Sequence, residues 1–206
     1  MNIKEYKFIF MVTAIGLIIG TSFTFFYMVF PYPVTSDKFF VLSVLGNNST
    51  ASDYYPHDNP NIGINDTLNW NIYVQNYMQE AKYVLIKIKI VNSSDKYPDS
   101  LTCTPSTGFE LMNVTTILSP EQYSIIPFTW RILNYSSYDD FNVIHRVEIC
   151  DVNYTIEEYG VSGSNSHFIF ELWYYDIESD EFKFEWLSGS ESYCAWNKLR
   201  FNLIEA

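Results

Sequence analysis

The stretch Asn69-Trp70-Asn71-Ile72-Tyr73-Val74-Gln75 carries the pattern that decides the fold, because its largest apolar side chains occupy every second position. Successive side chains of a β-strand point to opposite faces, so this period predicts a strand with one buried and one wet face. The same alternation recurs at 86–90, 182–186 and 199–203. No pattern of helical period follows residue 37. The sequence therefore predicts an all-β domain.

Further apolar segments and the turn-forming residues between them extend this prediction. We expect strands at about 38–45, 109–116, 122–131, 143–150 and 167–175. Clusters of Gly, Pro, Asn, Asp and Ser predict turns near 46–63, 92–108, 134–140, 160–166 and 188–192. Pro127 has no amide hydrogen and is expected at a sheet edge or a break. Seven to nine short antiparallel strands predict a two-sheet sandwich of immunoglobulin-like architecture, and a closed barrel is the alternative.

An uncharged apolar run from Phe8 to Phe30 precedes this domain. About 20 helical residues cross a hydrocarbon core of about 30 Å, so 8–30 is predicted to be a transmembrane signal-anchor helix. Pro31 and Pro33 would end it. A cleaved signal peptide is the alternative, but its apolar region is shorter and ends in small residues. Gly16 and Gly20 form a small-xxx-small pair that suits helix packing, although one such pair also arises by chance.

Lys4 and Lys7 lie just before the apolar run and predict its orientation. Positive residues favour the cytoplasmic side, so residues 1–7 are expected in the cytoplasm and 38–206 outside it, after a short tether at 31–37. We therefore predict a single-pass protein of the cell membrane with an extracellular C-terminal domain. The tether would keep that domain close to the bilayer.

Acidic residues dominate the part of the chain that follows the apolar run. Lys4, Glu5 and Lys7 are the charged residues of the first 36, which leaves 10 basic and 23 acidic residues and a net charge of −13. Such a surface repels phosphate backbones, so we expect no nucleic-acid partner. The simpler interpretation of these acidic residues is a solvated extracellular face. The alternative is a cation-binding surface.

Sequons for N-glycosylation occur seven times, always after the apolar run. They begin at Asn47, Asn48, Asn65, Asn92, Asn113, Asn134 and Asn153. An acceptor asparagine must be exposed on an extracytoplasmic route, so the sequons favour the same topology. The alternative is that an Asn- and Ser-rich composition produced them by accident.

Three cysteines, Cys103, Cys150 and Cys194, follow the apolar run. Outside the cytoplasm an odd number suggests one disulfide and one remaining thiol, and all three residues are candidates. No pair of Cys or His has the spacing of a zinc site, and neither Cys150 nor Cys194 is followed by copper ligands.

Candidate chemistry elsewhere is weak. His57, His145 and His167 are far apart in sequence, and His145 shares the parity of apolar neighbours, which predicts a partly buried structural histidine. Asp176, Glu178, Asp180 and Glu181 could bind Ca²⁺ through oxygen atoms. They lack the spacing and the glycine of a calcium loop, so a solvated turn between strands 167–175 and 181–187 is expected. Abundant Tyr and Trp suggest carbohydrate stacking as a further alternative to core packing.

Several short segments carry a family resemblance. They are Lys38 to Gly46, Tyr54-Tyr55-Pro56, Leu68 to Val74, Ile126 to Thr129, and Phe170 to Tyr175. Together they resemble a family of uncharacterised archaeal and bacterial membrane proteins. The resemblance implies an extracytoplasmic immunoglobulin-like domain beside a membrane and brings no catalytic residues. Members often have several membrane spans, whereas this chain is predicted to have one.

The function predicted from these features is a structural or interaction module of the cell envelope. We expect contacts with other membrane or cell-surface proteins, leave a homo-oligomer open, and expect neither a cofactor nor enzymatic activity. An extracytoplasmic sugar- or cation-binding module is the alternative.

Overall fold

The computed structural model describes residues 37–91, 95–138, 141–156 and 161–204, together with Thr13 and Gly16. The rest of the predicted anchor, including Gly20, lies outside the described residues. Among those that are described, no helix is both long and apolar enough to cross a membrane. The signal-anchor helix thus stays a prediction, and the following description concerns the unit Asp37–Ala206.

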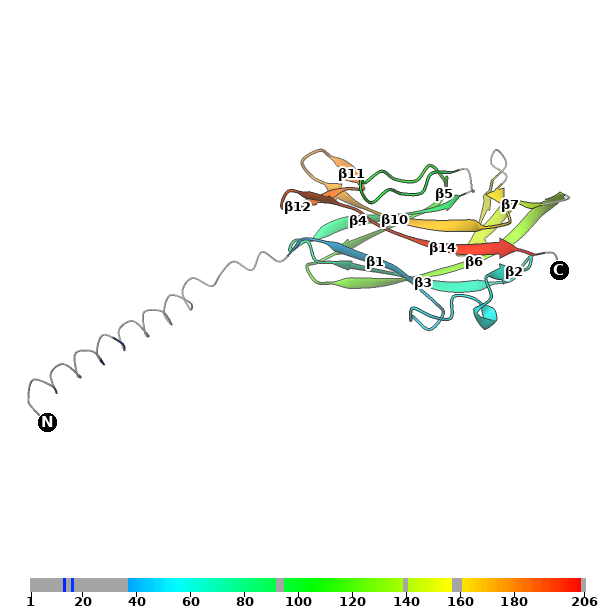
Figure 1. The fold of residues 1–206 in the computed structure, drawn as a ribbon, viewed down its shortest axis with the longest axis horizontal. Coiled ribbons are helices and arrows are strands. Elements are labelled where there is room, and N and C mark those ends of the chain that lie inside the picture. The colour runs from blue at the N-terminus through cyan, green and yellow to red at the C-terminus, as the bar shows by residue number, and fades with distance from the viewer. Residues whose placement is uncertain are drawn as a thin grey trace, which may run out of the picture. The chain divides into compact units, whose positions relative to one another are not determined.

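Strands from all parts of this unit form two sheets (Figure 1). The first sheet has the order β1-β3-β6-β7-β8 with β9 beside β7, and its strands are β1 (Phe40–Leu45), β3 (Leu68–Asn76), β6 (Tyr123–Tyr138), β7 (Phe141–Ile149), β8 (Val152–Thr155) and β9 (Val161–Ser162). The second has the order β2-β14-β10-β4-β5 with β11 beside β10, and its strands are β2 (Asn61–Ile62), β4 (Lys82–Val91), β5 (Phe109–Leu118), β10 (Ser166–Asp176), β11 (Glu181–Lys183) and β14 (Ala195–Leu203). A separate hairpin contains β12 (Trp186–Ser188) and β13 (Glu191–Tyr193), and a short 3₁₀ helix, η1 (Pro56–Asp58), precedes β2.

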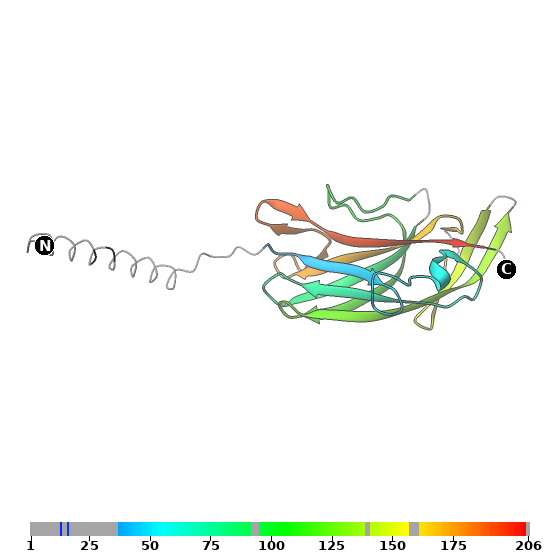
Figure 2. The same cartoon turned by 60° about the horizontal axis from the view of Figure 1, so that its bottom comes forward.

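The order of the strands is that of an immunoglobulin-like sandwich. The second and fifth long strands, β3 and β6, lie side by side in one sheet, while β4, β10 and β14 are neighbours in the other. Strands B and E, and strands C, F and G, have this arrangement in immunoglobulin-like domains. The sheets face each other as two layers (Figure 2), so the predicted sandwich is confirmed and the barrel is not found.

Aromatic side chains from both sheets fill the space between the layers. Trp70, Phe128 and Trp130 of the first sheet meet Phe168, Phe170 and Phe201 of the second, and all six are almost fully buried. The ring centroids of Trp130 and Phe168 are 4.7 Å apart. The large apolar residues at every second position of the sequence are thus the side chains that point from each strand into the core.

Several predicted boundaries are wrong: the short strands β2 and β9 lie within the predicted turns 46–63 and 160–166, and two larger differences concern β6 and the segment 182–186. Strand β6 continues through 134–138, where a turn was expected, because β7 pairs with it as far as Tyr138 and absorbs register shifts around Asn134. The single strand expected at 182–186 is two strands: β11 pairs with β10, whereas β12 pairs with β13. The prediction for Pro127 is confirmed, because β7 pairs with β6 only from Trp130 onward and leaves that side of Pro127 open.

Candidate functional site

A groove of about 1000 Å³ lies at the end of the sandwich where β11, β12 and the start of β1 meet. Lys38, where the chain enters the domain, is part of the groove lining. The amide of Lys38 donates to Ser188 Oγ at 3.0 Å, and the indole of Trp186 donates to the carbonyl of Lys38 at 3.1 Å. These bonds attach the β12–β13 hairpin to the first residues of the domain.

Aromatic rings form much of the groove surface, namely Trp173, Tyr174, Phe182, Phe184 and Trp186. Phe184 and Trp186 are buried, and their rings pack against Trp173 and Phe40, with centroids 5.5 and 5.2 Å apart. The other three are half-buried and present part of their surface to solvent. Phe184 and Trp186 therefore act mainly as core, while Trp173, Tyr174 and Phe182 keep part of their surface exposed in the groove.

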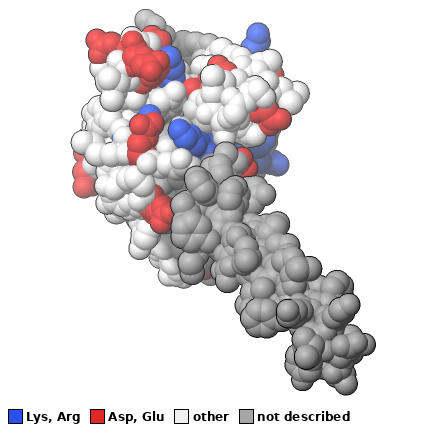
Figure 3. Space-filling view, turned by 90° about the vertical axis from the view of Figure 1, so that its left-hand side faces the viewer, with Lys and Arg blue, Asp and Glu red and all other residues white. Residues whose placement is uncertain are grey.

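Charged side chains of both signs surround these rings. The lining contains five carboxylates, Glu80, Asp176, Glu178, Glu181 and Glu185, and three lysines, Lys38, Lys82 and Lys183. The ammonium of Lys87 lies 4.4 Å from the centroid of the Trp173 ring, outside the groove lining. Figure 3 shows this end of the domain, where acidic and basic side chains are interspersed among uncharged ones. The excess of carboxylates gives the groove a net negative charge.

The acidic turn predicted as a calcium candidate is held by its own hydrogen bonds. Asp176 pairs with Lys183 and accepts a bond from Ser179 Oγ at 3.0 Å, and these partners lower the pKa of its carboxyl. Tyr175 donates to Asp180, which raises the pKa of the tyrosine. Among the described residues, no group of three or more His, Cys, Asp or Glu side chains is arranged to hold a metal ion. The turn is therefore a hydrogen-bonded hairpin in which Asp176 and Asp180 are already engaged, while Glu178 and Glu181 are exposed.

Two aliphatic side chains stand on the rim of the groove. Ile177 is 84% exposed and Leu187 is 63% exposed, and both belong to the groove lining. Burying aliphatic surface of this kind against a partner is favourable. The rim thus adds an apolar contact surface to a charged and aromatic groove.

A buried ion pair fixes the loop 95–108, which supplies Cys103 and Pro105 to the groove. Lys89 Nζ lies 3.0 Å from Glu171 Oε2 and donates to the carbonyl of Ser106 at 2.8 Å. The other oxygen of Glu171 accepts bonds from the amide and the hydroxyl of Ser106, both at 2.6 Å. The alternation at 86–90 predicted a wet face that includes Lys89. That prediction is wrong at Lys89, because the loop covers it.

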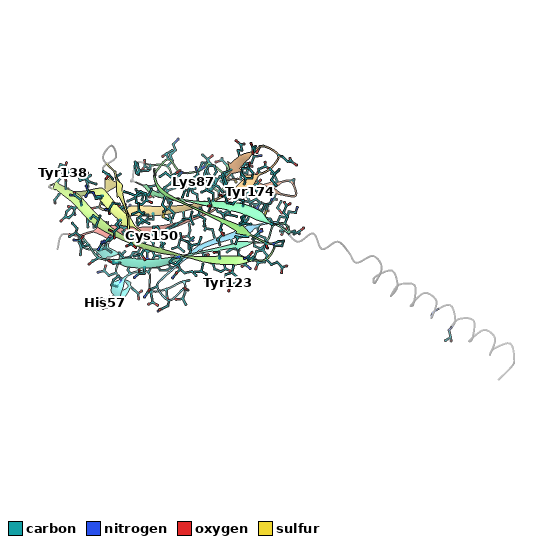
Figure 4. The ribbon with its side chains drawn as sticks, turned by 180° about the vertical axis from the view of Figure 1, so that it is seen from behind. His57, Lys87, Tyr123, Tyr138, Cys150 and Tyr174 are labelled. Atoms are coloured by element: carbon teal, nitrogen blue, oxygen red, sulfur yellow. The ribbon has the colours of Figure 1, made fainter. Side chains whose placement is uncertain are left out.

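The histidines neither meet one another nor line the groove. His57 is exposed, and His145 is half-buried with Nε2 2.8 Å from Ser136 Oγ. His167 is buried with Nδ1 3.0 Å from the hydroxyl of Tyr97, and burial together with Lys198 and Arg200 lowers its pKa. Figure 4 shows His57 and Tyr138 toward the end of the domain opposite Tyr174.

The predicted modification sites are spread over the domain and leave the groove free. Asn92 lies outside the described residues, and the other six sequon asparagines are all exposed: Asn47, Asn48, Asn65, Asn113, Asn134 and Asn153. None of these six lines the groove. Around Gly16, which is described, a Cβ atom would meet nothing within 4 Å, so the structure supplies no packing partner for that member of the predicted glycine pair.

The cysteines divide into a pair and a single residue. Cys150 lies in the turn between β7 and β8 of the first sheet, and its thiol points to the carbonyl of Pro127 at 3.7 Å. Cys103 and Cys194 both lie against residues 99–100 of the loop 95–108. All three are thiols in this structure.

Sequence spacing gave little sign of the groove. Its lining comes from 38, 78–82, 103–105 and 173–187, and two of the strands that build it, β11 and β12, are only three residues long. One usable signal was present, because Ile177 and Leu187 are aliphatic residues within polar, turn-like segments.

Comparisons with known proteins do not assign the chain to a family. No family model matches the chain, and no curated protein matches it. Among solved structures, it is similar to a CARDB domain from Pyrococcus furiosus, solved in complex with di-metal ions, at 9% identity and a TM-score of 0.40, covering 82% of this chain and 90% of that one.

Two other solved structures are similar to the chain at the same level. A β-glucosidase from Listeria innocua matches at 6% identity and a TM-score of 0.38, with 82% of this chain but 16% of that one covered. The C-terminal domain of wzt matches at 7% identity and a TM-score of 0.36, with 83% and 80% covered. Because these TM-scores are all below 0.5, the fold assignment depends on the strand order, and these proteins supply no argument about function.

Proposed function

We propose that this chain is a membrane-anchored interaction module of the cell envelope, and that its groove binds a basic, partly apolar segment of a neighbouring membrane protein. The observation that carries the proposal is the rim. Ile177 and Leu187 expose most of their aliphatic surface beside the half-buried rings of Trp173 and Tyr174. Protein interfaces combine such apolar and aromatic anchors with a charged periphery.

The charge of the groove supports a basic partner. Its five carboxylates exceed its three lysines. Asp176 is paired with Lys183, while Glu178 and Glu181 are exposed. A segment with Lys or Arg beside an apolar residue would satisfy the free carboxylates and cover the rim together.

The place where the chain enters the domain supports a partner in the same membrane. Lys38 lines the groove, and seven residues, 31–37, separate it from the end of the predicted helix 8–30. Seven extended residues span at most about 25 Å. If 8–30 crosses the bilayer, the groove is held within that reach of the membrane surface.

Predicted glycans would not obstruct this contact. The six described sequon asparagines lie outside the groove lining. Sugar chains at those positions would therefore cover other faces and leave the groove accessible.

Binding of a sugar or a cation is the second candidate, and the half-buried rings beside carboxylates favour it specifically. Aromatic faces can stack on sugar rings, and carboxylates bind Ca²⁺. We rank it lower because the rings of Trp173 and Phe182 already contact Phe184 and Tyr83.

The test is co-purification of the full chain from native membranes in mild detergent. Ile177→Asp and Leu187→Asp add a negative charge where apolar contact is expected, so each should remove the co-purifying protein while the Tm stays within about 2 °C. Ile117→Asp is the matched control, because Ile117 is 68% exposed on β5 and does not line the groove. Retention of the partner by both rim variants contradicts the proposal.

A thermal-shift measurement on the same preparation distinguishes sugar or cation binding from contact with a protein partner. A rise in Tm with Ca²⁺ or with oligosaccharides, in a preparation without any co-purifying protein, would favour ligand binding over protein contact. A second copy of this chain as the sole co-purifying partner would identify the groove as a homo-oligomer interface instead.

A further inference from the structure

The thiols of Cys103 and Cys194 lie together although 90 residues separate them in the sequence. Cys103 Sγ is 3.9 Å from the carbonyl oxygen of Ser100, and Cys194 Sγ is 4.0 Å from that of Asp99. The thiol of Cys103 is close enough to contribute to raising the pKa of Cys194. Neighbouring carbonyls of one turn thus bring both sulfur atoms to the same place.

Further bonds hold this arrangement on both sides. The turn is closed by backbone bonds between Asp99 and Thr104, at 2.9 and 3.2 Å. Beyond Cys194, the indole of Trp196 donates to Ser100 Oγ at 2.9 Å. The loop 95–108 is therefore already attached to β14 at the point where the two thiols meet.

From this geometry we infer that Cys103 and Cys194 form a disulfide in an oxidising compartment and that Cys150 remains a thiol. Cys150 lies in the β7–β8 turn of the other sheet, and its sulfur contacts the carbonyl of Pro127. A disulfide needs its two Cα atoms within about 7 Å of each other. The pairing selects one connectivity from the three that three cysteines allow.

The reaction is a thiol–disulfide exchange with a small or protein disulfide as the oxidant. Cys194, the half-buried member, loses a proton and attacks the oxidant, which releases one thiol and leaves a mixed disulfide on Cys194. Cys103 then loses its proton and displaces the second half of the oxidant as a thiol. Two protein thiols are oxidised, one disulfide is reduced to two thiols, and an S–S bond joins residues 103 and 194.

The environment of the thiols governs the rate of this exchange. Burial and the neighbouring thiol of Cys103 raise the pKa of Cys194 to about 12. Thiolate is the attacking species, so the uncatalysed reaction should be slow at pH 7 and faster at higher pH. Once formed, the bond would fix Cys103, which lines the groove, to the start of β14.

The experiment is disulfide mapping of the full-length protein. It is purified in mild detergent, incubated with oxidised glutathione, denatured without reductant, alkylated and digested for mass spectrometry. We expect a cross-linked peptide pair that contains Cys103 and Cys194, with Cys150 alkylated. Alkylation of both Cys103 and Cys194, or a cross-link to Cys150, would overturn the inference.

Thermal unfolding gives a second readout. A bond that closes a loop of about 90 residues should raise the Tm by roughly 10 °C. A reductant should therefore lower the Tm of the oxidised wild type and of Cys150→Ser by that amount. Cys103→Ser and Cys194→Ser should start lower and not respond to reductant. If a variant fails to fold, the peptide map of the wild type still decides.

Discussion

Two buried tryptophans at the centre of the core differ in one hydrogen bond. Trp70 Nε1 donates to the carbonyl of Tyr54 at 2.6 Å, whereas Trp130 Nε1 is buried and has no hydrogen-bond partner among the described residues. A buried polar group that loses its partner costs about 1–3 kcal/mol. The two indoles therefore contribute unequally to the free energy of unfolding, although both are almost fully buried.

Replacing each tryptophan by phenylalanine separates these contributions. Both changes remove similar volume, but Trp70→Phe also leaves the Tyr54 carbonyl unsatisfied, while Trp130→Phe removes an unsatisfied donor. We expect Trp70→Phe to lower the free energy of unfolding by at least about 1 kcal/mol more than Trp130→Phe. Urea denaturation of the two variants measures the difference, and equal losses would contradict this account.

The stability of the domain should depend on pH through His167. Its pKa in the folded protein is below the usual value of about 6.5, so below that pH the unfolded chain binds more protons than the folded one. The free energy of unfolding is then unaffected by His167 above pH 7 and decreases as the pH falls toward 5. His167→Gln can still bond to Tyr97 but cannot be protonated in this range, so its Tm should vary less between pH 7.5 and 5.

At the scale of elements, the loop 95–108 depends on the buried pair of Lys89 and Glu171. Glu171→Gln keeps the shape of the side chain but leaves the ammonium of Lys89 buried without its counter-charge. Breaking a buried pair in this way costs about 3–5 kcal/mol. Lys89→Met together with Glu171→Gln removes the unpaired charge, so the double variant should be more stable than Glu171→Gln alone. Denaturant unfolding checks the order, and the opposite order would mean that the charges are not coupled.

The turn between β7 and β8 has a backbone that its residues disfavour. Cys150 and Asp151 have φ values of +48° and +65°, as the two central residues of a type I′ turn do. Glycine adopts such angles at little cost, and alanine does not. Asp151→Gly should therefore raise the free energy of unfolding by about 0.5–1 kcal/mol, while Asp151→Ala should lower it. The two Tm values should lie on opposite sides of the wild type, and a shift of both in one direction would show that the side chain matters more than φ.

Long strands were predictable from the sequence, and the groove was not. The alternation at 69–75 and 199–203 reports burial directly, because each strand has one face on the core. At 182–186 the same period continues while the chain leaves β10 and pairs elsewhere, since Phe184 between β11 and β12 and Trp186 at the start of β12 both stay buried. Alternation shows which side chains point inward but not which strand is the neighbour, so a site built from 38, 103–105 and 173–187 leaves no local signal.

At the scale of the whole molecule, the predicted sugar attachment sites in the described part of the chain lie on exposed positions. All six described sequon asparagines are exposed, as an acceptor requires. We expect glycopeptide mass spectrometry of the native protein to find modified asparagines among them. Asn61 and Asn69 are exposed but belong to no sequon, so they should remain unmodified. Unmodified asparagine at all six positions would contradict the predicted glycosylation.

Two of those asparagines lie on the outermost strands of the sheets. Asn113 is on β5, the last strand of the second sheet, and Asn153 is on β8, the last strand of the first. An open sheet edge presents unpaired amides and carbonyls that can add a strand from another molecule. A bulky glycan on each edge would block such stacking sterically. If sugars are attached at Asn113 and Asn153, they would hinder strand addition at β5 and β8, so the predicted glycosylation would also limit aggregation through these two edges.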